Sequence, residues 1–107
     1  MQIQTLSSDT PQLLQDIQDM PVLIVFSSFS CPACTLMEPE LVQFAQQHDT
    51  IRVFLLHAER FPQTAAAFHI RLFPTTILLD KGKPVSMDIG AMRCAQLEAF
   101  VQHAIEM

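Results

Sequence analysis

The residues best able to do chemistry in this 107-residue chain are two cysteines, which frame the run Cys31-Pro32-Ala33-Cys34. Three residues are about one helical turn, so two thiols at this spacing can form a disulfide and reopen it. The apolar run at residues 22–26 ends just before them and predicts a buried strand. A strand followed by a Cys-x-x-Cys at a helix start indicates thiol–disulfide exchange.

The two thiols are not expected to be equivalent. A helix that begins at about Cys31 leaves its first backbone N–H groups unpaired, and these groups and the helix dipole stabilise an anion. Cys31 is therefore predicted to be the more acidic thiol and the nucleophile, because the thiolate is the attacking species. Cys34, one turn further and facing inward, would resolve the mixed disulfide. Pro32 suits the first helical position, where a missing N–H costs nothing.

Composition favours one small domain, covering residues 1–107, with functional cysteines. Half of the residues are hydrophobic, and only three are cysteines, which argues against a disulfide-stapled secreted fold. The first basic residue is Arg52, so the sequence shows no charged signal-peptide start and predicts a cytoplasmic protein. No apolar run approaches the roughly 18 residues of a membrane span, so no membrane association is expected.

Charge is distributed unevenly along the chain. Residues 1–51 carry six acidic side chains and no lysine or arginine, whereas the rest carries five acids and six bases. Nucleic-acid binding is not expected, because the phosphate backbone requires a basic patch. No cation in this acidic half is available to hold the Cys31 thiolate, so backbone N–H groups must do so.

Hydrophobic periodicity and turn signals predict an α/β fold, in which a central mixed five-stranded sheet is flanked by four helices. The order along the chain is β-α-β-α-β-α-β-β-α. The predicted strands are residues 3–6, 22–26, 51–57, 75–79 and 84–89, the last two joined by a hairpin turn at 80–83. The predicted helices start at Thr10-Pro11, span 31–48 and 63–69, and close the chain with an amphipathic segment.

The chain as a whole resembles a thioredoxin. The matching landmarks, in order, are Pro21-Val22-Leu23, the Cys31/Cys34 pair, Pro39, Ile70-Arg71, Phe73-Pro74-Thr75, the 80–83 hairpin and Ile89-Gly90-Ala91. This resemblance implies the thioredoxin fold, with a cis proline at Pro74 facing the disulfide. It also implies that the Phe73 backbone, with Thr75, Gly90 and Ala91 nearby, forms a groove for an extended substrate peptide.

The resemblance also implies partners and cofactors. Substrates would be proteins with disulfides, and a separate enzyme such as thioredoxin reductase would recycle a monomeric protein. The Cys31–Cys34 disulfide would be the only redox group, with no added cofactor. No histidine pair has metal-site spacing from the cysteines, so no metal site is predicted.

Several family features are missing. Ser27 and Ser30 stand at the places of the two family tryptophans. Val25 stands at the place of a buried acid that helps deprotonate the resolving thiol, and Leu55 at about the place of its lysine partner. Attack by Cys34 is therefore predicted to be slow. Replacing a buried ionic pair by apolar residues need not weaken the fold.

The dipeptide Pro32-Ala33 differs from the usual Gly-Pro. A proline after the first cysteine occurs in glutaredoxins and DsbA-type oxidants, so this protein is predicted to be less reducing than ordinary thioredoxin. Oxidase or isomerase activity is then also an open alternative. The alternative is that the dipeptide affects the geometry of the helix start and has little effect on the redox behaviour of the two cysteines.

Three further interpretations stay open. His57 is predicted at the strand end near the cysteines, where it could be a proton shuttle or a solvent-edge residue. Cys94 could be a regulatory thiol or a small buried side chain. The whole protein could be an oxidoreductase or a low-turnover binding or assembly module that uses the proline groove to hold a partner.

Overall fold

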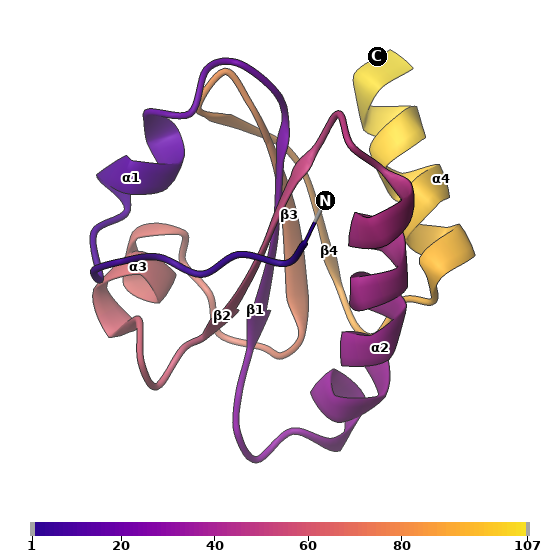
Figure 1. Ribbon diagram of the computed structural model, residues 1–107. Coiled ribbons are helices and arrows are strands. Elements are labelled where there is room, and N and C mark those ends of the chain that lie inside the picture. The colour runs from indigo at the N-terminus through magenta and orange to yellow at the C-terminus, as the bar shows by residue number, and fades with distance from the viewer. Residues whose placement is uncertain (1, 107) are drawn as a thin grey trace.

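A mixed β-sheet lies at the centre of the computed structural model, which describes residues 2–106 (Figure 1). Its strands are β1 (Val22–Ser27), β2 (Arg52–His57), β3 (Thr75–Asp80) and β4 (Lys83–Ile89), in the order β2-β1-β3-β4. Strand β1 runs parallel to β2 and antiparallel to β3, and β4 is antiparallel to β3.

Two helices lie on each side of this sheet (Figure 1). Helices α1 (Gln12–Gln15) and α3 (Pro62–Ala67) lie on one side, and α2 (Pro32–Gln47) and α4 (Cys94–Glu106) on the other. The predicted α/β architecture with four helices is confirmed. No helix in the described residues has both the length and the apolar character needed to cross a bilayer.

The prediction of a fifth strand at residues 3–6 is wrong. Gln4 forms a single parallel bridge with Phe54, through hydrogen bonds from Gln4 N–H to Val53 C=O (2.8 Å) and from Leu55 N–H to Gln4 C=O (3.1 Å). The pairing stops there because the chain leaves the edge of β2 and crosses to α3, where Asp9 binds. The sheet therefore has four strands in the part of the chain that the structure describes.

Asp9 holds the first turn of α3. Its carboxylate accepts hydrogen bonds from Gln63 N–H (2.8 Å), Thr64 N–H (2.8 Å) and Thr64 Oγ1 (2.7 Å). Desolvation raises the pKa of Asp9, but these hydrogen bonds outweigh it and the net pKa lies below the ordinary value. The charged form thus ties the N-terminal segment to a helix start whose N–H groups need acceptors.

Strand β1 is buried at every position, because both sheet faces are covered. Leu23 and Val25 pack with the residues of α2 and α4, whereas Val22, Ile24 and Phe26 pack on the opposite side. Since successive side chains of a strand alternate between faces, β1 divides the core into two clusters. The end of β1 leads directly to the two cysteines.

The loops at the opposite end of the sheet are held by close backbone contacts. Lys81 and Gly82 have positive φ values of 51° and 80° in the tight β3–β4 hairpin. A Cβ atom on Gly82 would collide with the carbonyl oxygen of Gln15 in α1. Glycine is thus required there both by the backbone conformation and by the approach of α1.

Candidate active site

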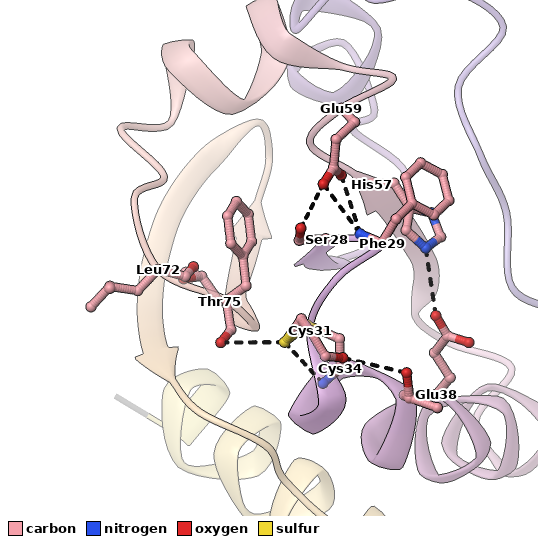
Figure 2. Close-up of a disulfide and its surroundings, with 11 residues drawn as sticks. Ser28, Phe29, Cys31, Cys34, Glu38, His57, Glu59, Leu72 and Thr75 are labelled. Carbon is pink, nitrogen blue, oxygen red and sulfur yellow. Dashed lines mark hydrogen bonds and ion pairs between the residues drawn. A yellow bond between two sulfur atoms is a disulfide. The ribbon is translucent and has the colours of Figure 1, made fainter.

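Cys31 and Cys34 lie at the start of α2 and form a disulfide, with their Cα atoms 5.2 Å apart (Figure 2). Cys31 is the N-cap of the helix, and its Sγ accepts a hydrogen bond from Cys34 N–H at 3.1 Å. Cys31 is half-buried, whereas Cys34 is only 3% exposed. The sulfur that an incoming substrate can reach is therefore also the one that faces the unpaired N–H groups of the helix.

Pro32 and Ala33 form the first turn of α2. The helix begins at Pro32, as the sequence predicts, because this residue has no N–H to leave unpaired. Pro32 is exposed and Ala33 half-buried. The helix also continues through Pro39 to Gln47.

The segment Phe73-Pro74-Thr75 lies against the disulfide from the other side. The Phe73 carbonyl oxygen is 3.7 Å from Cys31 Sγ, and the Phe73–Pro74 peptide is cis. Thr75 Oγ1 donates to the Leu72 carbonyl at 2.6 Å, and Gly90 N–H donates to the Pro74 carbonyl at 2.8 Å. The predicted groove residues Phe73, Pro74, Thr75 and Gly90 are therefore joined to one another beside the sulfurs.

Ala91 follows Gly90 on the same loop and is exposed. It lines a hollow of about 540 Å³ that also includes Leu36 and Met37 of α2. Gly90 itself has a φ of 111° and open space where a Cβ would lie. The loop after β4 thus lies across this hollow from Leu36 and Met37, and the role of Ala91 in substrate binding stays a prediction.

Comparison with known proteins gives a consistent result. The thioredoxin family profile matches residues 4–103. A thioredoxin of Alicyclobacillus acidocaldarius subsp. acidocaldarius is 38% identical over 89 residues, covering 82% of this chain and 85% of that protein. The chain belongs to the thioredoxin family. A thioredoxin of Synechocystis sp. is 31% identical over 93 residues, covering 79% of this chain and 87% of that protein.

The fold agrees with this membership in the thioredoxin family. The crystal structure of Malassezia sympodialis thioredoxin (Mala s 13) matches with a TM-score of 0.82 and 24% identity, covering 95% of this chain and 90% of that chain. The thioredoxin fold is therefore confirmed.

In this thioredoxin family member, the two apolar residues at the places of the family's buried charged pair are neighbours in the sheet. Val25 is 2% exposed and pairs in register with Leu55 on the neighbouring strand β2. Val25 belongs to the core cluster that includes residues of α2 and α4, and the half-buried Leu55 packs against that cluster. The two positions predicted to have lost their charges are thus cross-strand neighbours, and an apolar contact fills the space.

Two hydroxyl groups near this contact have no hydrogen-bond partner. Ser27 Oγ and Thr76 Oγ1 are both buried and unpaired. Thr76 pairs in register with Val25, and Ser27 lies two residues further along β1, so all three share one sheet face. Since buried hydroxyls are normally hydrogen-bonded, these two groups leave unused hydrogen-bonding capacity on the sheet face of Val25.

His57 lies at the end of β2, in register with Ser27. Its ring stacks on Phe29, with centroids 4.2 Å apart and planes within 4°, and its Nε2 lies 3.6 Å from a carboxylate oxygen of Glu38 (Figure 2). Neither sulfur is among its hydrogen-bond partners in the described residues. Its proposed part in proton transfer stays a prediction.

Sequence reasoning did not find Glu59, which fastens the loop before Cys31. The Glu59 carboxylate accepts hydrogen bonds from Ser28 Oγ at 2.5 Å and from Phe29 N–H at 3.2 Å (Figure 2). The Arg60 guanidinium lies 5.4 Å from the centre of the Phe29 ring, on the side chain that also stacks on His57. A carboxylate two residues after β2, at the sheet end that carries the cysteines, is the signal that could have revealed it.

The hydrogen bond from Ser28 lowers the pKa of Glu59, and backbone N–H groups of Glu59 and Phe29 and the charge of His57 add to this effect. A carboxyl with a lowered pKa in the folded state stabilises the fold above its unfolded pKa and loses that contribution as the pH falls through the folded value. Glu59 therefore holds the loop at neutral pH.

Glu59→Ala is expected to speed hydrogen exchange at Phe29 N–H several-fold at pH 7, because that amide loses its acceptor. Exchange should be measured by NMR in wild type and in Glu59→Gln, which keeps an oxygen acceptor and should fall between the two. In wild type the protection should weaken as the pH falls below about 4.3, the ordinary pKa of a glutamate. Equal exchange in all three proteins would show that Glu59 does not hold the loop.

Two further candidates are the third cysteine and a metal site. Cys94 is buried at the start of α4, and its thiol donates to Gln47 Oε1 at 3.7 Å. Burial raises the pKa of Cys94, and the charges of Glu98 and Glu40 raise it further, so its nucleophilic thiolate form is disfavoured. Residues 2–106 contain no group of three or more His, Cys, Asp or Glu side chains that could hold a metal ion.

Proposed function

We propose that the protein is a thiol–disulfide oxidoreductase that reduces disulfides of protein substrates through Cys31 and Cys34. The observation that carries this proposal is the Cys34 N–H group 3.1 Å from the Sγ of the more accessible cysteine. A thiolate of Cys31 has a hydrogen-bond donor there and the helix N-terminus behind it. The position of Phe73 beside Cys31 supports the same assignment.

The reaction has two steps, both nucleophilic displacements at sulfur. In the first, the Cys31 thiolate attacks one sulfur of the substrate disulfide. A Cys31–substrate disulfide forms, the substrate S–S bond breaks, and the second substrate sulfur leaves as a thiolate. In the second, Cys34 loses its proton and its thiolate attacks Cys31 Sγ. The Cys31–Cys34 disulfide forms, and the first substrate sulfur leaves as a thiolate, so two electrons pass to the substrate.

The second step is proposed to be the slower one. Cys34 is buried, and Val25 stands at the family place of its proton acceptor with Leu55 as its cross-strand neighbour; neither side chain can accept a proton. We propose that His57 receives this proton through water, since it lies in register with the buried hydroxyl of Ser27. A poorly deprotonated thiol is a weak nucleophile, so the mixed disulfide should be long-lived.

The proposal extends to redox poise and partners. A proline directly after Cys31 favours a pair less reducing than ordinary thioredoxin, and such a pair could also oxidise or isomerise substrates. Membership in the thioredoxin family favours an external reductase, such as thioredoxin reductase, as the electron donor. Neither displacement step requires a second copy of the chain or an added cofactor.

Cys31→Ser is expected to abolish catalysed reduction of a protein disulfide by dithiothreitol, leaving only the uncatalysed rate, because the nucleophile is gone. Insulin is a convenient substrate, since its reduction is followed by turbidity. Cys94→Ser is the matched control and should retain the wild-type rate, because Cys94 is buried and its thiol contacts Gln47 at the opposite end of α2 from the disulfide.

The second candidate function is a binding or assembly module, which the apolar Val25–Leu55 contact favours because it removes a catalytic aid. Under that function the wild-type protein would not exceed the uncatalysed rate, and Cys31→Ser would leave the biological activity intact. Rapid wild-type turnover that is lost in Cys31→Ser would rule it out.

A further inference from the structure

An apolar surface lies beside the disulfide on the α3 side of the sheet. The described residues expose nine large hydrophobic side chains, and four of them gather here: Leu72 (58% exposed), Val85 (48%), Met87 (58%) and Ile89 (50%). Met87 pairs in register with Ile77, whose side chain belongs to the core cluster on the α1 and α3 side. Alternation along β4 places Met87 and Ile89 on this face, and Val85 lies at the register shift that follows Ser86.

The apolar side chains of β4 are exposed in the part of the chain that the structure describes. All residues of this strand are exposed except Ser86, which is half-buried. Helix α3 has only six residues and ends before it can shield the edge of the sheet (Figure 1). Clustered exposed apolar side chains of this kind typically mark a binding surface.

The surface is hollowed along its length. A hollow of about 230 Å³ is lined by Leu72, Met87 and Ile89, and a second of about 520 Å³ by Val85 and Met87. Both hollows are lined by His69 and Met87, so they adjoin, and we call the two together the β4 groove. Its six defining residues are His69, Arg71, Leu72, Val85, Met87 and Ile89.

One end of the β4 groove, at Leu72, adjoins the segment that faces the disulfide. Leu72 immediately precedes Phe73, whose carbonyl oxygen lies 3.7 Å from Cys31 Sγ. Thr75 Oγ1 binds the Leu72 carbonyl, which fixes the groove to the segment that faces the sulfur. The Leu72 side chain points away from the disulfide (Figure 2). A substrate chain whose cysteine is bonded to Cys31 can therefore continue directly onto this surface.

The described lining of the groove includes no acidic side chain. His69 and Arg71 are its only titratable lining residues, and Arg71 has no ion pair within residues 2–106. A partner with an acidic residue beside its apolar side chains complements this lining. A second copy of the chain fits less well, because a two-fold contact would place the same basic patch on both sides.

We infer that the β4 groove selects substrates: it binds an extended segment of the substrate protein with a bulky apolar residue and an acidic residue next to the reactive cysteine. This inference rests on the proposed reductase function and names the substrate class of that site. Leu72, Met87 and Ile89 contact the apolar residue, and Arg71 pairs with the acid. Small disulfides need none of these contacts.

The test compares peptides that each carry an intermolecular disulfide. They differ only in the two residues next to the cysteine, which are Leu-Glu, Ser-Glu or Leu-Lys. Wild type should reduce the Leu-Glu peptide with a kcat/KM about tenfold above the Ser-Glu peptide, since partial burial of a leucine is worth about that factor. Met87→Ser/Ile89→Ser should remove this preference, and Arg71→Gln should remove the preference for Glu over Lys. Val42→Ser, an exposed apolar residue of α2, is the control and should keep both.

Two further measurements separate the inference from the proposed function. Dithiobis(nitrobenzoate), a small disulfide, should be reduced equally by wild type and groove variants. The Leu-Glu peptide with its cysteine replaced by serine should shift the Met87 methyl signal in NMR, even if the protein proved inactive as a reductase. Equal rates for all peptides, no shift at Met87, or a concentration-dependent dimer lost in Met87→Ser would each overturn the assignment of the groove to substrates.

Discussion

Cys34→Ser is expected to stop turnover and to hold the protein as a covalent adduct with its substrate. Cys31 still attacks the substrate disulfide, but no second thiol can displace the substrate from Cys31 Sγ. With excess protein disulfide, adducts should approach one per molecule, and multiple-turnover reduction should fall to the uncatalysed rate. Intact-protein mass spectrometry under non-reducing conditions measures both the yield and the partner's mass.

The controls for this trap use the other cysteines. Cys31→Ser/Cys34→Ser should form no adduct, because the nucleophile is absent. Cys34→Ser/Cys94→Ser should trap as efficiently as Cys34→Ser alone, because the Cys94 thiol is buried with a raised pKa. Adducts that disappear when Cys94 is replaced would show that the wrong sulfur had been assigned as the nucleophile.

Val25→Asp is expected to lower the free energy of unfolding by about 3–5 kcal/mol at pH 8, because it places an unpaired charge in the core. Val25 is 2% exposed, and its cross-strand neighbours are Leu55 and Thr76. Thr76, whose hydroxyl is unpaired, lies on the same sheet face and in register with residue 25. A hydrogen bond from this hydroxyl to the new carboxylate should reduce the loss in the free energy of unfolding. Urea unfolding of wild type and Val25→Asp measures the difference.

The pH dependence identifies the cause of that loss. Burial raises the pKa of an introduced carboxyl above its unfolded value of about 3.9. The folded state then binds the extra proton between the two values, so stability falls as the pH rises through that window, by up to about 1.4 kcal/mol per pH unit. Val25→Asn, which cannot ionise, should show no such slope. A Val25→Asp protein as stable at pH 8 as at pH 4 would contradict the apolar account of this position.

The same substitution should speed the second chemical step. A carboxylate at residue 25 offers the buried Cys34 thiol the proton acceptor that Val25 and Leu55 lack. The substrate should therefore leave the mixed disulfide faster in Val25→Asp than in wild type at pH 8, as measured by rapid quench. Unchanged release would indicate that deprotonation of Cys34 does not limit resolution.

The parts of this site that follow local rules were predictable from sequence. The apolar run of β1, the proline at the first position of α2 and the turn residues around Gly82 each have one favourable local structure, and the structure has them there. The segment at residues 3–6 looked equally like a strand. It failed to extend because its pairing depends on where Asp9 binds, a contact with α3 that is 54 residues away.

The contacts around the loop before Cys31 were not predictable. The stacking of Phe29 on His57 and the hydrogen bonds to Glu59 join residues about 30 positions apart through side-chain orientation, and hydrophobic periodicity contains no information about that orientation. The sequence placed His57 at the correct strand end, but it did not predict which residues contact His57. The exposure of the apolar residues of β4 was not predictable either, because the sequence pattern does not indicate that α3 is too short to cover them.

The most direct test of the account is the reduction potential of the Cys31–Cys34 pair, because one number reports whether the pair cycles and in which direction. The protein is equilibrated in graded thiol buffers, and alkylated thiols are counted by mass spectrometry. The Pro32-Ala33 turn predicts a reversible two-electron couple at a potential clearly above about −270 mV, the value of ordinary thioredoxin. A value at or below that potential would contradict the proposed redox poise, and a pair that does not cycle would contradict the oxidoreductase function itself.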